Sequence, residues 1–214
     1  MQMSEFKVQE ILNFRQLFFL DKFLMGHHGF IAGGCFKNIF NKEKVKDIDM
    51  FFESNADFNG AVKYFKDLIK ENPDEYKKSY ENKNVWAVYS IKDKLRIELI
   101  KSVFGRPDEI IQGFDFSITK FAYYRNLDNV DEEDYMAQFE VIYHEDYFEH
   151  LQMKRLVLDD EIPFPVSTFN RSYKYQSYGY GLCKESKIKL IEALRDIDKI
   201  DKSELSKSLY EGKD

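Results

Sequence analysis

The feature of this 214-residue chain that most limits its fold is the segment KDIDMFF at residues 46–52, where two aspartates stand one residue apart in an apolar run. Such a segment predicts a β-strand, in which successive side chains alternate between the two faces of a sheet. Asp47 and Asp49 then point to one face, and the apolar side chains between and after them point to the other. The strand therefore buries one face and gathers negative charge on the opposite one.

Two carboxylates this close repel each other unless a proton or a cation lies between them. A hard divalent cation such as Mg²⁺ suits the pair best, because it takes oxygen ligands and prefers sites that substrate phosphates complete. An isolated Asp-x-Asp is nevertheless more often a pair of solvated aspartates at a strand edge. The residues around Asp47 and Asp49 decide between these two interpretations.

A pair of glycines precedes the aspartates. Gly33 and Gly34 stand between a predicted strand at residues 30–32 and a predicted helix at residues 36–40. Glycines in this position let the backbone approach a phosphate, and N–H groups at the start of a helix favour anions. Lys37 either adds a positive charge toward the same phosphates or is an ordinary surface lysine.

A third acid comes from the segment LRIELI at residues 95–100. In a strand, Glu98 shares a face with Arg96, while the apolar residues beside them face the other way. This strand and VWAVYSI at residues 85–91 predict a hairpin. A neighbouring strand can thus bring Glu98 to the aspartate pair.

The remaining segments predict a mixed α/β (α+β) chain. Residues 4–25 have near-helical apolar spacing and predict an amphipathic opening helix, and residues 57–71 predict a second helix. FEVIY predicts a strand, and EDYFEHLQMKRLVL and SKIKLIEALRDI predict helices. The chain thus divides into residues 1–135, with the sheet, and a mostly helical portion at residues 136–214.

Composition excludes several classes of protein. The chain is 43% hydrophobic and 16% aromatic, as in globular proteins, with no apolar stretch near the roughly 20 residues of a membrane span. The start MQMSEFKVQE does not resemble a signal peptide, and two cysteines are too few for a disulfide framework, so we expect a cytoplasmic protein without a membrane partner. A net charge of -6 disfavours extended binding of duplex DNA but permits a local phosphate site.

Three other groups of residues have simple structural interpretations. His27-His28 lack further ligands at metal-binding spacing and predict a turn. Cys35 predicts a small buried residue beside the glycine turn. Four tyrosines either stack on a base or form the core and rim of a small helical domain. They are Tyr173, Tyr175, Tyr178 and Tyr180.

The order and spacing of these motifs resemble the nucleotidyltransferase superfamily, which includes DNA polymerase beta, poly(A) polymerases and CCA-adding enzymes. The likeness is nearest to the class II branch, where GGCFKNIFNKEKVKDID stands in place of GGxVRDxLLG…DxD and LRIELIKS matches the strand with a glutamate. GFDFSITKFAYY is similar to the motif RRDFTINALAY, and RSYKYQSYGYG is similar to the helix RALRFAARLGF. Small phage nucleotidyltransferases resemble the chain in having DIDxFF and FDF in this order.

The resemblance implies a nucleotidyltransferase fold, with a small mixed sheet flanked by helices and a C-terminal helical portion that closes over the nucleotide. It implies that Asp47, Asp49 and Glu98 are catalytic and bind two divalent cations, Mg²⁺ or Mn²⁺. It further implies that the chain moves a nucleoside monophosphate from an NTP to an acceptor hydroxyl and releases pyrophosphate.

The resemblance also implies a set of nucleotide-binding residues, namely Gly33, Gly34, Lys37, Asp115, Thr119, Arg171 and Lys174. Asp115 and Thr119 match positions that contact the sugar or base in the family. Arg171 and Lys174 are candidates for the triphosphate, since both cations pair with phosphate oxygens. The alternative is a helix cap for Asp115 and solvated helix residues for the basic pair.

The chain departs from the family motifs at two dipeptides. Lys37-Asn38 stands where the family has Arg-Asp, and Gly113-Phe114 stands where it has two arginines. These positions belong to the family motifs for base selection and triphosphate binding. The acceptor stays open between an RNA or transfer RNA end, a protein side chain, a small molecule and another nucleotide. An alternative function is a catalytically silent nucleotide-binding or interaction module of the same fold, such as a regulatory or anti-defence protein.

Overall fold

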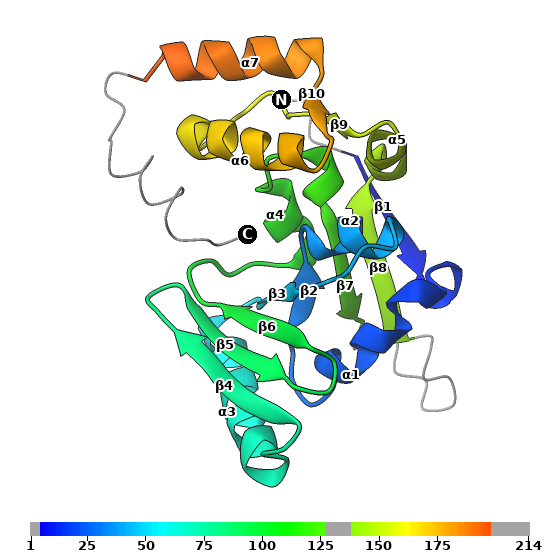
Figure 1. Ribbon diagram of the computed structural model, residues 1–214, viewed down its shortest axis with the longest axis vertical. Coiled ribbons are helices and arrows are strands. Elements are labelled where there is room, and N and C mark those ends of the chain that lie inside the picture. Colours follow the sequence, from blue (N-terminus) through cyan, green and yellow to red (C-terminus); the bar gives the residue numbers. More distant parts are fainter. Residues whose placement is uncertain (1–4, 127–137, 198–214) are drawn as a thin grey trace. The chain divides into compact units, whose positions relative to one another are not determined.

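The structure of the chain is a computed structural model that describes residues 5–126 and 138–197 (Figure 1). The chain forms two compact units. The larger unit contains Glu5–Phe114 and Thr119–Glu145. The smaller unit contains Asp115–Ile118 and the described residues 146–197, so the chain passes from one unit to the other more than once.

A mixed sheet of eight strands organises the larger unit. Its strands are β1 (Phe6–Glu10), β2 (Phe30–Ala32), β3 (Asp47–Phe51), β4 (Tyr76–Glu81), β5 (Val85–Ser90), β6 (Leu95–Ile100), β7 (Phe121–Arg125) and β8 (Phe139–His144). They lie in the order β1-β8-β7-β2-β3-β6-β5-β4. β3 and β6 pair in parallel, and the other neighbours pair antiparallel.

Short helices and one long helix accompany this sheet. They are the 3-10 helices η1 (Ile11–Asn13), η2 (Arg15–Leu20) and η3 (Ser117–Thr119), and the α-helices α1 (Asp21–Leu24), α2 (Cys35–Phe40), α3 (Asn55–Glu71) and α4 (Pro107–Gln112). α4 contributes Ile110 and Ile111 to an apolar cluster with Phe30 and Phe51 on one face of the sheet. No helix in the described ranges combines the length and the hydropathy that crossing a bilayer requires.

β3 has the alternation that its sequence predicts. Ile48 and Met50 are completely buried, whereas Asp47 and Asp49 are partly exposed. β6 alternates in the same way, with Leu95, Ile97 and Leu99 inside. The central strands thus place their apolar side chains in a core and their carboxylates on the other face.

The prediction of one amphipathic helix at residues 4–25 is wrong. This segment instead forms β1, which pairs with β8, followed by η1, η2 and the short helix α1. Leu24 is buried within α1. From residue 11 to residue 23, buried residues recur at every third position, which matches the three residues per turn of a 3-10 helix rather than the 3.6 of an α-helix. They are Ile11, Phe14, Leu17, Leu20 and Phe23.

The other elements confirm a mixed α/β fold. β2, β3, β5, β6 and β8, and helices α2 and α3, form where the sequence predicts strands and helices. The sheet is larger than predicted because β1, β4 and β7 extend it. The division between residues 135 and 136 stays a prediction; residues 127–137 lie outside the described residues, and β8 belongs to the larger unit.

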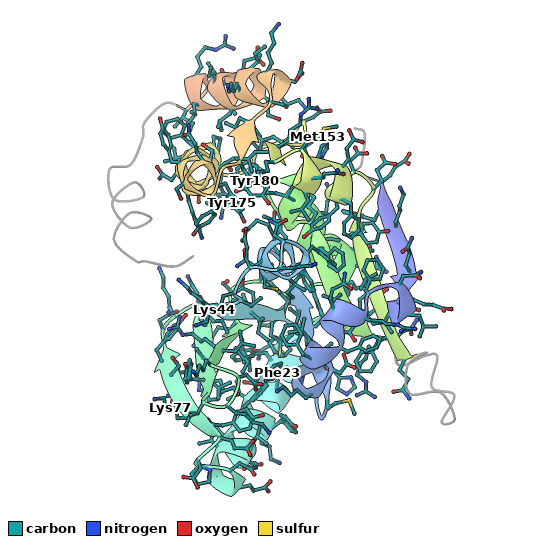
Figure 2. The ribbon with its side chains drawn as sticks, turned by 45° about the vertical axis from the view of Figure 1, so that its right-hand side comes forward. Phe23, Lys44, Lys77, Met153, Tyr175 and Tyr180 are labelled. Atoms are coloured by element: carbon teal, nitrogen blue, oxygen red, sulfur yellow. The ribbon has the colours of Figure 1, made fainter. Side chains whose placement is uncertain are left out.

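The smaller unit is mostly helical. It contains α5 (Tyr147–Gln152), α6 (Pro165–Ser177) and α7 (Lys184–Arg195), with β9 (Arg155–Leu156) and β10 (Gly181–Leu182) paired in parallel. Figure 2 shows Tyr175 and Tyr180 close together, and both are buried while Tyr173 and Tyr178 are exposed. This burial favours the core-and-rim interpretation of the four tyrosines.

Candidate functional site

The three acids singled out from the sequence meet on one face of the sheet. β3 and β6 pair with Asp49 opposite Glu98 and Asp47 opposite Arg96. Paired strands stand roughly 4.8 Å apart, so these side chains are direct neighbours. The prediction that a neighbouring strand brings Glu98 to the aspartate pair is confirmed.

The glycine turn borders this group of acids. β2 pairs with β3 on the side away from β6, with Ala32 opposite Asp49. Gly33 follows at a φ of +101°, a backbone conformation that favours glycine. A methyl group on Gly33 would lie 3.8 Å from Oδ2 of Asp49 and 3.6 Å from the ring of Phe114. Gly34, which caps α2, has an ordinary helical φ of -68°.

A cation of the protein itself already lies among the acids. Nη1 of Arg96 donates a hydrogen bond to Oδ1 of Asp47 at 2.9 Å and lies 3.6 Å from Oε1 of Glu98. The guanidinium also lies over the ring of Tyr80, 5.7 Å from its centroid. Arg96 thus compensates the charge of two carboxylates, a role that the sequence analysis missed although it placed Arg96 on the face of Glu98.

Tyr80 approaches the same acids from the edge strand β4. It lies opposite Ala87 of β5, which lies opposite Glu98 of β6. The small side chain of Ala87 leaves room for the phenol to reach across to Glu98. Burial, followed by the hydrogen bond to Glu98 and the charge of that carboxylate, raises the pKa of Tyr80. The phenol therefore stays protonated and donates to Glu98. We call Asp47, Asp49, Glu98, Arg96 and Tyr80 the acid cluster.

The donors of the acid cluster suit a divalent cation, but their side chains do not converge on a single point. Carboxylates are the ligands that Mg²⁺ and Mn²⁺ prefer. Within the described residues, no three Asp, Glu, His or Cys side chains converge on a point where a metal ion could bind. The hydrogen bond of Asp47 to Arg96 gives the physical reason, because it directs one carboxylate oxygen to a guanidinium. A protein cation, as well as a metal ion, can thus neutralise these acids.

Two other residues beside the glycine turn, Lys37 and Cys35, are buried in the protein. Nζ of Lys37 is 3.0 Å from Oε2 of Glu43, and the Lys37 side chain is only 5% exposed. This ion pair gives Lys37 a structural role, and its contact with a nucleotide stays a prediction. Cys35 is buried, as predicted, and burial together with the charge of Asp49 raises the pKa of its thiol well above the usual value.

The remaining predicted nucleotide-binding residues are distributed over both units. Asp115 forms an ion pair with Nε of Arg171, and both residues belong to the smaller unit. Lys174 lies one turn further along α6 and is half-buried. Thr119 ends η3 in the larger unit and is half-buried. The Asp115–Arg171 pair joins the segment Asp115–Ile118 to α6, and its nucleotide-binding role stays a prediction.

A separate cavity of about 450 Å³ lies in the larger unit, near the start of β2. None of the predicted site residues lines it. Both carboxylate oxygens of Glu140 in its wall are engaged, by the hydroxyl of Tyr124 at 2.9 Å and by Nδ2 of Asn126 at 3.1 Å. The acid cluster, at the other end of β2, is therefore the candidate site that combines sequence motif and geometry.

Comparison with solved structures identifies the fold. A CCA-adding enzyme solved with CTP matches with a TM-score of 0.64 and 15% identity, over 99% of this chain and 50% of that chain. A tRNA nucleotidyltransferase solved with a primer tRNA and an ATP analogue matches with a TM-score of 0.53 and 19% identity, over 84% of this chain and 50% of that chain. The Thermotoga maritima CCA-adding enzyme with tRNA matches with a TM-score of 0.54 and 17% identity, over 92% of this chain and 47% of that chain. The nucleotidyltransferase fold is thus confirmed.

Comparison of sequences gives the family. A protein of Bacillus phage SPbetaL7 described as "Gabija anti-defense 2" is 24% identical over 175 residues, which are 81% of this chain and 39% of that protein. The chain therefore spans about two fifths of the length of this phage relative. The model of the family described as "Gabija anti-defense 2 family protein" matches residues 8–154. Because this match covers more than half of the sequence, the chain belongs to the Gabija anti-defense 2 family.

Proposed function

We propose that the chain is a metal-dependent nucleotidyltransferase that moves a nucleoside monophosphate from an NTP to an acceptor hydroxyl and releases pyrophosphate. The observation that carries this proposal is the parallel pairing of β3 and β6, which sets Asp49 opposite Glu98 on the face that Gly33 borders. Asp47, Asp49 and Glu98 would hold Mg²⁺ or Mn²⁺. A divalent cation bound there would neutralise the triphosphate and lower the pKa of the acceptor hydroxyl.

The chain's own residues have separate tasks in this proposal. The absence of a side chain at Gly33 lets a phosphate approach the acid cluster. Carboxylate oxygens of Asp49 and Glu98 would hold the cation beside the acceptor hydroxyl and the phosphate. The other nucleotide-binding residues in this proposal are assigned from the family motifs alone. They are Gly34 and Lys37 for phosphates, Asp115 and Thr119 for the sugar or base, and Arg171 and Lys174 for the triphosphate.

The acceptor is the least defined part of the proposal. The solved structures of similar fold carry CTP, an ATP analogue or tRNA in their descriptions. CTP, ATP and RNA ends are therefore the first substrates to test, followed by protein side chains and small molecules. The net charge of -6 favours recognition of a local end over a long duplex.

A second candidate is a catalytically silent module of the same fold. One structural observation favours it, because Arg96 neutralises part of the acid cluster without a metal ion. The anti-defence description of the family also fits a protein that acts by binding a nucleotide or a partner. In this alternative, the acid cluster is a structural ion-pair network.

The substitution Asp49→Asn tests the enzymatic proposal. The purified chain is incubated with labelled NTPs, Mg²⁺ and total bacterial RNA and protein, and each fraction is then assayed for label. We expect label in one fraction with the wild type and a loss of more than about 100-fold in Asp49→Asn, because a metal ligand is removed. Asp67→Asn on the exposed side of α3 is the matched control and should keep full transfer. Transfer that survives in Asp49→Asn would contradict catalysis at this site.

Thermal shift with each NTP distinguishes the two candidates. An enzyme of the proposed kind is stabilised by its NTP when Mg²⁺ is present, because the metal ion links the triphosphate to the acids. A silent nucleotide-binding module is stabilised equally with Mg²⁺ and with EDTA. The second pattern, together with absent label transfer, would decide for the silent module.

A further inference from the structure

We propose that Arg96 is the resident counter-cation of the acid cluster, and that a divalent cation binds Asp47, Asp49 and Glu98 only by displacing it. This inference rests on the proposed function for the identity of the metal ligands. It assigns to Arg96 control over the binding of a divalent cation to these acids.

The strand register places Arg96 where a metal ion would be needed. Arg96 and Asp47 occupy directly paired positions of β6 and β3, and Glu98 follows two residues later on the same face. Nη1 lies 2.9 Å from Asp47 and 3.6 Å from Glu98, so one nitrogen stands between the two carboxylates. Both acids are partly shielded from solvent, which strengthens their attraction to the guanidinium.

Oδ1 of Asp47 and Oε1 of Glu98 face the Arg96 nitrogen, so a divalent cation that used these two oxygens would compete with the guanidinium for them. Mg²⁺ bound through these two oxygens would take the place of the Arg96 nitrogen between the two carboxylates. The two positive charges would stand a few ångströms apart and repel each other. Loading of the acid cluster therefore requires that Asp47 exchange Arg96 for the metal ion.

The contacts of Arg96 are compatible with such an exchange. Its Nε–H is buried and finds no acceptor among the described residues, so the present ion pair leaves one donor unsatisfied. One aromatic ring already contacts Arg96, because the ring of Tyr80 lies against the guanidinium, which is 5.7 Å from the ring centroid. A cation that leaves Asp47 can thus remain over an aromatic ring.

Binding of Mn²⁺ in the absence of nucleotide tests the inference. The whole chain is titrated with Mn²⁺, and free Mn²⁺ is measured by electron paramagnetic resonance. Arg96→Gln should bind Mn²⁺ about five- to tenfold more tightly than the wild type, because the competing cation is removed. Arg96→Gln with Asp47→Asn should lose this gain. Equal or weaker Mn²⁺ binding by Arg96→Gln would overturn the inference.

Two further variants control the measurement. Arg106→Gln removes another ion-paired arginine of the larger unit, whose Nη2 lies 2.9 Å from Asp108, and should leave Mn²⁺ affinity unchanged. Arg96→Lys keeps a positive charge without the planar fork and should give a smaller gain than Arg96→Gln. If Arg96→Gln fails to fold, Arg96→Lys provides the same comparison, and its binding must then exceed that of the wild type.

Failure of this inference is separate from failure of the proposed function. The Mn²⁺ titration contains no nucleotide, so it reports on the acid cluster alone. Tighter Mn²⁺ binding by Arg96→Gln without label transfer by the wild type would support the inference and reject the enzyme. Label transfer by the wild type with unchanged Mn²⁺ affinity in Arg96→Gln would support the enzyme and reject the role of Arg96.

Discussion

Gly33 borders the acid cluster, and its backbone conformation is one that favours glycine. Gly33 has a φ of +101°, and a Cβ there would make ordinary contacts with Asp49 and Phe114. The cost of a side chain therefore comes from the backbone rather than from a clash. A residue of any other type would have to adopt a conformation that it rarely populates.

Gly33→Ala should lower the free energy of unfolding by about 1–3 kcal/mol, as expected for a strained backbone position. Gly60→Ala in α3 is the matched control, because a Cβ there meets nothing within 4 Å and the residue is helical. This control should raise the free energy of unfolding by about 0.5–1 kcal/mol. Urea unfolding of both variants measures the difference, and equal stability would show that the turn does not need glycine.

His27 makes stability depend on pH. Burial lowers the pKa of His27 from 6.5 to about 4, and its ring packs against Tyr64 and Phe65. Its Nδ1 accepts a hydrogen bond from the N–H of Gly29 at 3.0 Å, so the neutral ring fits this site. In the unfolded chain the His27 ring becomes protonated as the pH falls below 6.5. In the folded chain it stays neutral until the pH falls to about 4.

The contribution of His27 to stability is therefore complete above pH 6.5 and decreases as the pH falls toward 4. Between pH 7.5 and pH 5 this linkage should remove about 2 kcal/mol from the free energy of unfolding. His27→Gln should lose this part of the pH dependence, and the exposed His28→Gln should retain it. Urea unfolding at several pH values checks the result, and identical pH profiles for His27→Gln and the wild type would contradict it.

Among the elements, α3 shows how a local signal sets a boundary. The apolar spacing predicts that this helix begins at Asp57, whereas it begins at Asn55 with Ser54 as its N-cap. Oγ of Ser54 accepts a hydrogen bond from the N–H of Asp57 at 3.2 Å and donates one to its carboxylate at 2.5 Å. Ser54 thus satisfies an N-terminal N–H of the helix, and its own hydroxyl is oriented by the carboxylate of Asp57, a pairing that the spacing Ser-x-x-Asp signals.

Ser54→Ala should lower the free energy of unfolding by about 1 kcal/mol, because a backbone N–H of α3 loses its acceptor. Ser79→Ala, at the exposed bulge of β4, is the control and should change stability by less than about 0.5 kcal/mol. Thermal unfolding followed by circular dichroism measures both. A Ser54→Ala variant as stable as Ser79→Ala would show that the cap contributes nothing.

The sequence of β4 does not by itself predict a strand. The strand reads YKKSYE, and Lys77, Lys78 and Ser79 are exposed, so it lacks an apolar alternation. Figure 2 shows Lys77 at the outer edge of the sheet of the larger unit. Lysines and a bulge are common on edge strands, where they oppose pairing with another chain. Pairing with β5, rather than local preference, makes this segment a strand.

For the molecule as a whole, the division into units does not follow the order of the chain. Asp115–Ile118 lies in the smaller unit between two segments of the larger one. Phe116, only 1% exposed, packs edge to face on Tyr175 of α6 with ring centroids 5.4 Å apart. The bridge between Phe116 and Leu158 attaches the same segment to the chain before α6. Folding of the smaller unit therefore depends on a segment distant in sequence.

Phe116→Ala should lower the free energy of unfolding of the smaller unit by about 3–5 kcal/mol, as for other fully buried phenylalanines. Phe164→Ala, also in the smaller unit but 68% exposed, is the matched control and should cost less than about 0.5 kcal/mol. Amide hydrogen exchange should show faster exchange in α6 for Phe116→Ala alone. Unchanged protection of α6 in Phe116→Ala would contradict this role of the segment.

Local patterns in the sequence by themselves determined the strand of the two aspartates, the glycine turn before it and the order of motifs that the nucleotidyltransferases share. Alternation along a strand depends only on neighbouring residues, so the face of Asp47 and Asp49 could be predicted. The motif order also predicted that Glu98 lies nearby, which the register of β3 and β6 confirms.

Only the tertiary structure decided which side chains neutralise the acids. Arg96 contacts Asp47 across 49 positions of the chain, and Tyr80 reaches Glu98 over Ala87 from an edge strand. Such contacts depend on strand order and register, which many distant residues determine together. The same holds for the start of the chain, where pairing with β8 makes residues 6–10 a strand and the short helices η1, η2 and α1 take the place of the predicted α-helix.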